Sequence, residues 1–299
     1  MRESDLLNWI FTQTSGAAGV RVGPGDDCAV MDVGGEALLV TVDQVLEEVH
    51  VRLAEDGAFA AGRKALARNL SDIAAMGGRA IGAVASVALP RGCDESMGQE
   101  IYRGLRSIGD EFSCPVIGGD VAAWDQRLCV SVTVLGLAST AGPILRSGGR
   151  AGDVLLVTGS LGGAWRGRRH LEFTPRIREG RVLAEQYGAT AMIDLSDGLA
   201  TDLNHLCRLS ELGARVDAAA VPIAPDITGD PLKAALTDGE DYELLVAMDP
   251  TDADRLLSES PFDVPVSRIG TLTEAREVLL IDRGESRPLK PEGWEHSTE

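Results

Sequence analysis

Several features that would assign a chain of 299 residues to a special class are missing from this sequence. Its five cysteines are scattered and form no C-x-x-C pair, which argues against a disulfide framework or a zinc site and favours a reducing compartment. The amino terminus has no basic segment followed by an apolar one, so we expect no secretory leader. No apolar run approaches the roughly 20 residues of a membrane span. We therefore expect a soluble, cytoplasmic protein.

Positive charge is also scarce. The chain has 28 Lys and Arg against 46 Asp and Glu, a formal net charge of −18, which argues against nucleic acid or an anionic membrane as a partner. Such acidity is also found in merely very soluble proteins, so by itself it does not indicate a metal site. The hydrophobic content of 44% is ordinary for a folded chain. The length suffices for two domains.

Three familiar catalytic signatures are absent. The sequence contains no G-x-x-x-x-G-K-[ST] phosphate loop, no H-E-x-x-H metal motif and no G-x-S-x-G nucleophile elbow. Its four histidines lack the spacing of metal ligands. A Walker-type nucleotide site, a zinc hydrolase and a serine hydrolase are therefore disfavoured.

Apolar runs and helical periodicity alternate along the chain. Strands are expected at 37–45, 80–89, 129–138, 154–159 and 240–248, helices at 57–76, 95–111 and near 176–187, and a strand-turn-helix unit at 189–212. The turn-rich stretch 142–153 indicates a domain boundary near residue 139, between parts 1–138 and 139–299. The last 15 residues are expected to be loosely held, apart from Trp294. These patterns predict a mixed α/β protein in two halves.

Aspartate recurs beside Gly, Ser or Thr at the ends of apolar segments. The instances are GDD (25–27), TVD (41–43), LSD (70–72), GGD (118–120), DLSDG (194–198) and DGED (238–241). Each has an ordinary alternative: Asp43 could be a turn residue, Asp197 a helix N-cap, and Asp72 a surface residue of a helix. Asp is nonetheless a poor helix former.

Taken together, the six segments favour magnesium chemistry. Mg²⁺ takes oxygen ligands in an octahedron and uses few carboxylates per ion, with phosphate and water completing the shell. Several ions on one triphosphate therefore require single Asp residues that converge from several segment ends. The spacing does not establish that they converge.

The motifs also occur in the order known from one enzyme family. GPGDDCAV, TVDQVLEEVHV, KALARNLSDIAAMGG, VIGGDV, RSGGRAGDVLLVTGSLGG, ATAMIDLSDGLATDL and DGEDYELL resemble those of thiamine-monophosphate kinases, of the aminoimidazole ribonucleotide synthetase-like superfamily. The resemblance extends from Asp5 to Trp294. It implies a two-domain α/β fold whose N-terminal sheet forms a barrel across a homodimer, with the active site between the domains. It also implies Mg²⁺-dependent transfer of a phosphoryl group from ATP to thiamine monophosphate, without a general base.

The resemblance assigns roles to individual residues. The implied Mg²⁺ ligands are Asp27, Thr41, Asp43, Asp72, Asp120, Asp194 and Asp197, of which Asp43, Asp120 and Asp197 are the catalytic set. Around ATP it implies Tyr102, Gly119, Asp120, Arg146 and Ser196. For thiamine monophosphate it implies His50, Glu240 and Trp294. In isolation, Trp294 is better explained as a tail residue packing on the body of the protein.

Some positions depart from the family's pattern. Val42 and Val121 replace hydroxyl residues beside the metal motifs, Glu48, Val51 and Asp238 differ near the substrate motifs, and the segment 161–174 is shortened. Two alternatives therefore stay open. One is a relative with a different acceptor, making an aminoimidazole ribonucleotide or selenophosphate. The residues typical of those enzymes are missing, and Cys28 is better explained as a small buried residue than as a reactive one. The other is a nucleotide-binding homologue with weakened catalysis.

Overall fold

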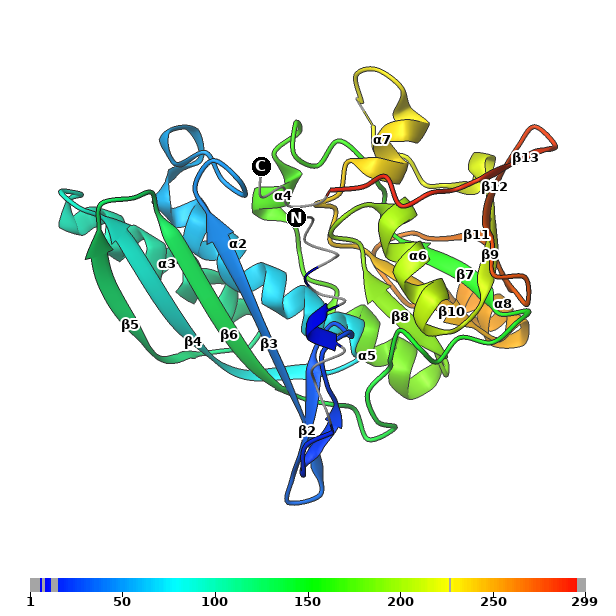
Figure 1. The fold of residues 1–299 in the computed structure, drawn as a ribbon, viewed down its shortest axis with the longest axis horizontal. Coiled ribbons are helices and arrows are strands. Elements are labelled where there is room, and N and C mark those ends of the chain that lie inside the picture. Colours follow the sequence, from blue (N-terminus) through cyan, green and yellow to red (C-terminus); the bar gives the residue numbers. More distant parts are fainter. Residues whose placement is uncertain (1–5, 7–8, 12–15, 226, 295–299) are drawn as a thin grey trace.

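The chain folds around two β-sheets that follow one another along the sequence. The computed structural model describes residues 6, 9–11, 16–225 and 227–294. Figure 1 shows the two sheets side by side, with helix α2 (Leu53–Ala75) running between them. The predicted two-part α/β architecture is confirmed.

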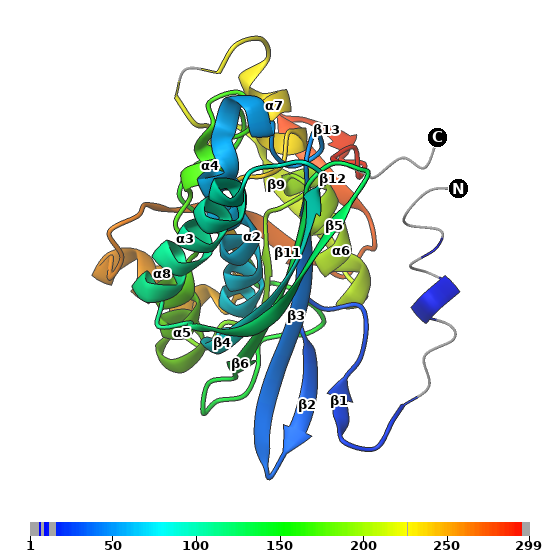
Figure 2. The same ribbon diagram turned by 90° about the vertical axis from the view of Figure 1, so that its left-hand side faces the viewer.

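The first sheet is built from the N-terminal half. Its strands are β1 (Val20–Val22), β2 (Ala29–Val33), β3 (Glu36–Leu46), β4 (Arg79–Pro90), β5 (Val116–Trp124) and β6 (Cys129–Leu137). They lie in the order β1-β2-β3-β6-β4-β5, and β5 is a free edge that pairs in parallel with β4. Helix α2 and helix α3 (Glu95–Glu111) cover one face, as Figure 2 shows.

Side chains alternate between the two faces of this sheet, as the pleat requires. On β6, Val130, Val132 and Val134 are completely buried against the helices. On the other face Val42 is 62% exposed and Val84 is 40% exposed. The first sheet thus has one covered face and one uncovered face that is partly apolar.

The second sheet comes from the C-terminal half. Its strands are β7 (Val154–Thr158), β8 (Ala191–Asp194), β9 (Gly213–Asp217), β10 (Leu244–Met248), β11 (Val266–Thr273), β12 (Val278–Asp282) and β13 (Glu285–Pro288). Their order is β13-β12-β9-β11-β7-β10-β8. The helical segments of this half are α4 (Arg169–Glu172), α5 (Ile177–Gln186), α6 (Leu199–Leu209), η1 (Ala218–Ala220), α7 (Pro231–Thr237) and α8 (Pro250–Glu259).

Both faces of the second sheet are covered near its centre. Leu155 and Val157 of β7 belong to a core that includes α6, whereas Val154 and Leu156 belong to another core that includes α5 and α8. This accounts for the unbroken apolar run VLLV, because a strand that is buried on both sides needs no polar face.

Helix α2 joins the two halves. Leu66, Leu70 and Ile73 lie in the core of the first sheet, whereas Ala74 and Ala75 lie in a core of the second half with α5. Helix α2 therefore lies at the junction between the two halves and packs against both of them.

Most expected elements are present, with differences at their ends. The expected helix 95–111 matches α3, whereas helix α2 extends further than expected and is interrupted at Gly57, where φ is +82°. The strand expected from residue 240 begins at Leu244, because Glu240 and Tyr242 have φ of 61° and 51°, which a strand does not accommodate.

The C-terminal tail is more ordered than expected. Residues 285–288 form β13 and pair antiparallel with β12, so the expectation of a loosely held tail is wrong for this part. Residues 295–299 lie outside the described residues, as does most of the first 15 residues. In the described part of the chain, none of the helices is long and apolar enough to span a membrane.

Helices α2 and α3 approach closely at two glycines. A Cβ atom on Gly62 would lie 2.1 Å from the carbonyl oxygen of Ile101, and one on Gly104 would lie 2.0 Å from that of Phe59. Since backbone atoms cannot yield as flexible side chains do, the contact requires glycine at both positions.

We predict that Gly104→Ala lowers the free energy of unfolding by roughly 1–3 kcal/mol or more, because the helices must separate. Gly98→Ala on the same helix is the matched control. Its Cβ would meet only a side-chain carbon of Leu89 at 3.8 Å, so higher helix propensity should stabilise the protein by about 0.5–1 kcal/mol. Urea unfolding of both variants measures the difference, and equal stabilities would contradict the close-packing argument.

Candidate active site

Three buried or partly buried carboxylates from separate segments meet at the junction between the halves. They are Asp27 in the turn before β2, Asp72 near the end of α2, and Asp194 at the end of β8. One oxygen from each lies within 4.8 Å of the others. The predicted convergence of distant aspartates is thus present for these three residues.

The turn GPGDD is held in place by one arginine. Arg146 contacts both oxygens of Asp27, with Nε 3.0 Å from Oδ2 and Nη2 2.7 Å from Oδ1. Its backbone N–H donates to the carboxylate of the neighbouring Asp26. Gly25, with φ of +126°, supplies a backbone conformation that other residues rarely adopt. Arg146 therefore gives both adjacent acids hydrogen-bond donors, its backbone N–H for Asp26 and its guanidinium group for Asp27.

The cluster has more negative charge than the protein compensates. Burial, with the nearby charges of Asp43 and Asp194, raises the pKa of Asp72 well above its usual value. Burial and Asp27 raise the pKa of Asp194 to about 8, and burial and Asp27 raise that of Asp26 to about 7. A group of carboxylates that is so reluctant to ionise is well suited to bind a divalent cation, which would relieve the repulsion.

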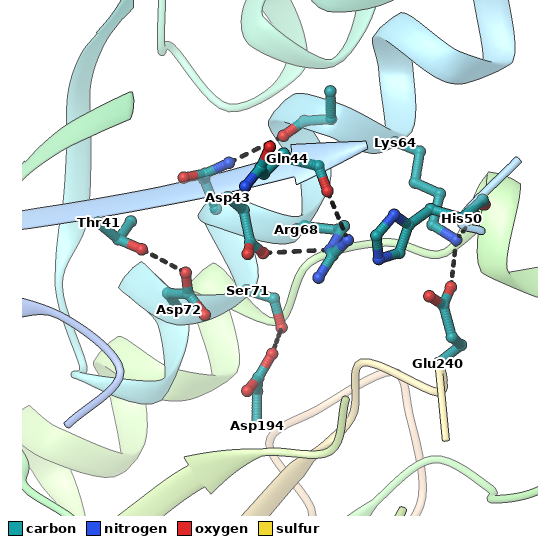
Figure 3. A network of polar contacts seen from close by, with 12 residues as sticks. Thr41, Asp43, Gln44, His50, Lys64, Arg68, Ser71, Asp72, Asp194 and Glu240 are labelled. Carbon is teal, nitrogen blue, oxygen red and sulfur yellow. Dashed lines mark hydrogen bonds and ion pairs between the residues drawn. The ribbon is translucent and has the colours of Figure 1, made fainter. Parts of the chain in front are cut away.

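Two hydroxyl groups and the guanidinium group of an arginine surround the carboxylate cluster. Thr41 donates a hydrogen bond to Asp72, and Ser71 donates one to Asp194 at 2.6 Å. Asp43 lies on the same face of β3 as Thr41, two residues on, and pairs with Arg68 at 3.1 Å between Oδ2 and Nε. Figure 3 shows these residues around the end of β3 and along α2.

The donor set fits magnesium. It consists of carboxylate and hydroxyl oxygens, which Mg²⁺ prefers, and within the described residues no histidine or cysteine belongs to the candidate metal-binding group. Cys28 is buried as expected, and burial together with Asp72 raises the pKa of its thiol. Asn69, one turn before Asp72, is also buried, and among the described residues its Oδ1 has no hydrogen-bond partner.

Backbone hydrogen bonds connect the turn that carries Ser196, an expected ATP residue, to the expected substrate residues Glu240 and Trp294. The backbone N–H of Glu240 donates to the carbonyl of Ser196 at 2.7 Å, and that of Trp294 donates to the carbonyl of Asp197 at 3.0 Å. A Cβ on Gly293 would lie 2.0 Å from that same Asp197 carbonyl. The C-terminal tail therefore lies directly on the turn that carries Asp197.

The substrate-side residues His50 and Glu240 are linked through Lys64. The ammonium group of this completely buried lysine donates to the carbonyl of His50 at 2.8 Å and pairs with Glu240. The resemblance assigns Glu240 to the thiamine monophosphate site, and in the structure the charge of its carboxylate is compensated by Lys64. The side chain of Glu240 is 17% exposed.

The structure does not bring Asp120, Gly119 or Tyr102 to the cluster. Asp120 lies on β5 in register with Ser86 of β4, on the uncovered face of the sheet. Thr41 and Asp43 lie on the covered face, and strands β6 and β4 separate β3 from β5. Three strand spacings amount to roughly 14 Å. Gly119 lies on the same edge strand, and Tyr102 is 52% exposed on α3.

Several polar residues of the junction were not predicted from the sequence. Lys64, Arg68 and Ser71 follow one another on α2 at intervals of four and three, and they share one helical face with the expected ligand Asp72. This spacing of polar residues within the apolar run KALARNLSDIAAM was a usable signal. Asp202 of α6 was also missed. It is buried and accepts a hydrogen bond from the backbone of Asp197.

Comparison with known proteins assigns the chain to a family. Residues 25–138 match the family model for AIR synthase related protein, N-terminal domain, and residues 150–282 match the one for the C-terminal domain. A thiamine-monophosphate kinase of Rhodopirellula baltica is 35% identical over 283 residues, covering 90% of this chain and 88% of the relative. The chain belongs to the thiamine-monophosphate kinase family, among the AIR synthase related proteins.

Further members of this kinase family match over almost the whole chain. The Bacillus subtilis thiamine-monophosphate kinase is 31% identical over 325 residues, covering 99% of both chains. The solved structure named "AaThiL complexed with AMPPCP and TMP" has a TM-score of 0.86 and 27% identity, and covers 99% of this chain and 97% of that one. The resemblance stated from the motifs is confirmed.

The segment 161–174, which is expected from the sequence to be shortened, contributes to the site. Its helix α4 has only four residues, yet His170 is buried, with Nδ1 2.7 Å from Nζ of Lys64. Trp165 stacks on His170, with 4.4 Å between ring centroids. This segment therefore supplies side chains that close this end of the junction.

We predict that Mg²⁺ stabilises the protein and does so more strongly at high pH. The folded-state pKa of Asp194 is raised, so its carboxyl favours folding when protonated, and this stability is lost as pH rises from about 4 towards 8. In EDTA the melting temperature should fall over this range. Added Mg²⁺ should raise it by several degrees at pH 8 and by less at pH 5.5, since protons compete with the metal.

The matched variants are Asp194→Asn and Asp263→Asn, the latter with a side chain that is 98% exposed. Asp194→Asn should melt higher than the wild type in EDTA at pH 8 and respond little to Mg²⁺. Asp263→Asn should behave as the wild type does. Differential scanning fluorimetry provides the measurement, and an undiminished Mg²⁺ response in Asp194→Asn would remove this residue from the metal site.

Proposed function

We propose that this protein phosphorylates thiamine monophosphate to thiamine diphosphate with ATP as the phosphoryl donor. The observation that carries the proposal is the meeting of Asp27, Asp72 and Asp194 in a chain that relatives named thiamine-monophosphate kinase match over most of its length. The structural neighbour bound to AMPPCP and TMP supports ATP as co-substrate and the phosphorylated thiamine as acceptor.

The metal in this proposal is Mg²⁺, held by Asp27, Asp72 and Asp194, with Thr41, Asp43 and Asp197 as further ligands. When bound, the metal would supply positive charge to a site that must hold two polyanions. The raised pKa values of Asp72 and Asp194 support this assignment, because repulsion among these groups is otherwise only partly relieved by Arg146.

The chain's own residues position and screen the reactants. A phosphomonoester has a second pKa of about 6, so the acceptor oxygen is already ionised at pH 7 and needs no general base. What remains is alignment and relief of repulsion. Arg146 and Ser196 are proposed to face the donor nucleotide, together with Tyr102 and Gly119. His50, Glu240 and Trp294 are proposed to face thiamine monophosphate.

We infer that a second copy of the chain completes the site. Asp120 lies on the uncovered face of the first sheet, at its free edge, too far from Asp43 to share a ligand with it in one chain. That face carries exposed apolar residues, among them Val42 and Val84, and on the edge strand Ile117 is 63% exposed. A homodimer joined through this face, forming the barrel expected from the family, would cover them and bring Gly119 and Asp120 to the other subunit's site.

The two halves would then have different tasks. We propose that residues 1–138 bind ATP and Mg²⁺ and form the dimer, and that residues 139–299 form the C-terminal α/β domain that closes the site. The last strand of the first sheet ends at Leu137 and the first strand of the second begins at Val154, which supports a division in the intervening segment. The cytoplasmic location expected from the scattered cysteines stays a prediction.

We predict that Asp120→Asn lowers kcat at least about 100-fold while the melting temperature of the protein is unchanged, because one metal ligand is lost at an exposed position. Asp125→Asn, whose side chain is 78% exposed near the same edge, should retain wild-type activity. The measurement is thiamine diphosphate formed from ATP and thiamine monophosphate. Full activity in Asp120→Asn would eliminate its metal role, and ATP binding without product in the wild type would favour the catalytically weakened homologue.

A mixing experiment tests whether the site is shared between subunits. Asp120→Asn and Asp72→Asn should each be inactive, but a mixture that exchanges subunits should recover about a quarter of the wild-type rate, because half of the dimers are mixed and each mixed dimer has one intact site. Light scattering should give a dimer for the wild type. No recovery from verified mixed dimers would place both residues in the site of one chain.

A further inference from the structure

One buried amine saturates its hydrogen-bonding capacity at the substrate end of the junction. Lys64 has no exposed surface, and an ammonium group has three N–H donors. The structure provides three acceptors: the carbonyl of His50 at 2.8 Å, Nδ1 of His170 at 2.7 Å and the carboxylate of Glu240. Figure 3 shows Lys64 directed from α2 towards Glu240, beside His50.

The three acceptors come from three separate segments of the chain, of which the segments of His170 and Glu240 are also joined by the ion pair between Arg169 and Asp241. His50 lies in the loop after β3, Glu240 in the loop before β10, and His170 in the short helix α4. Burial lowers the pKa of Lys64 to about 8 and also lowers that of His170, so near pH 7 the lysine is mostly charged and the imidazole neutral. Neutral His170 can then accept from Lys64 through Nδ1.

The loop that carries Glu240 has a strained backbone and is held by several contacts, of which Lys64 supplies one. Gly239, Glu240 and Tyr242 all have positive φ, of 69°, 61° and 51°, a conformation that costs free energy at the two non-glycine residues. Glu240 is held on one side by its backbone bond to Ser196 and on the other by Lys64. Trp165 covers this arrangement, with Nζ of Lys64 5.4 Å from its ring centroid.

We propose that Lys64 is the positioning residue of the acceptor site: by binding His50, Glu240 and His170 at once, it sets the geometry in which thiamine monophosphate is bound. The proposal rests on the proposed function. Lys64 has no exposed surface with which to meet the substrate, so it acts through His50 and Glu240. It lies two helical turns from Asp72 on α2, so its loss should affect the acceptor far more than the nucleotide and metal.

Lys64→Met tests this directly. The KM for thiamine monophosphate should rise at least about tenfold, while the KM for ATP stays within about twofold, because only the acceptor side loses its geometry. His170→Phe keeps the aromatic contact with Trp165 but removes one acceptor, and should raise the same KM by a smaller factor, about threefold. Calorimetric titration with thiamine monophosphate should show the same order of affinities without turnover.

Arg176→Met is the control for simple destabilisation. Arg176 forms a bidentate ion pair with the buried Glu243 within the C-terminal half of the protein, and breaking a buried pair is costly wherever it lies. It should lower the melting temperature, as Lys64→Met does, without a selective change in either KM. Assays are run well below both melting temperatures. If Lys64→Met does not fold, His170→Phe and Lys64→Arg give the same comparison.

Selective loss of acceptor affinity in Lys64→Met and His170→Phe, but not in Arg176→Met, supports the proposal. Unchanged affinity in the lysine variant, or equal loss for ATP, overturns it. If the wild type binds thiamine monophosphate but does not phosphorylate it, the proposed function fails and the titrations still decide the role of Lys64. If it does not bind thiamine monophosphate, both proposals fall.

Discussion

Mutual repulsion among buried acids is the constraint on which the junction between the two halves depends. Asp27, Asp72 and Asp194 come from segments far apart in the sequence, yet their oxygens lie within 4.8 Å of one another. Bringing such groups together costs free energy that hydrophobic burial elsewhere must offset. The hydrophobic core of each sheet supplies part of this stabilising free energy.

Helix α2 is the element that makes this arrangement feasible. Its apolar side completes the first core, its last turn reaches the second, and its polar face carries Lys64, Arg68, Ser71 and Asp72 into the junction. The charges on this face are arranged by sign. Cations at the earlier positions meet Glu240 and Asp43, and the acid at the later position meets other acids. One end is thus internally neutral, and the other end is suited to a cation.

This division gives the two ends different chemistry. The acidic end has hard oxygen donors and fits Mg²⁺ with phosphate. The neutral end has His50, Glu240 and His170 held by a single ammonium group. For a reaction that joins two anionic reactants and needs no proton removed, such a layout separates charge neutralisation from recognition of the acceptor.

The sequence by itself determined the two-part α/β fold, most core elements and the identity of the acids. Periodicity and turn signals depend on neighbouring residues, which is why helix 95–111 was predicted to the residue. The strand expected from residue 240 begins only at Leu244, because Glu240 and Tyr242 have positive φ values and their backbone N–H groups bond to Ser196 and Leu195. Only the tertiary structure decided which acids meet. Asp27, Asp72 and Asp194 do, whereas Asp120 lies on the other face of a sheet at its edge, because strand order and register are set by packing between residues far apart in the chain.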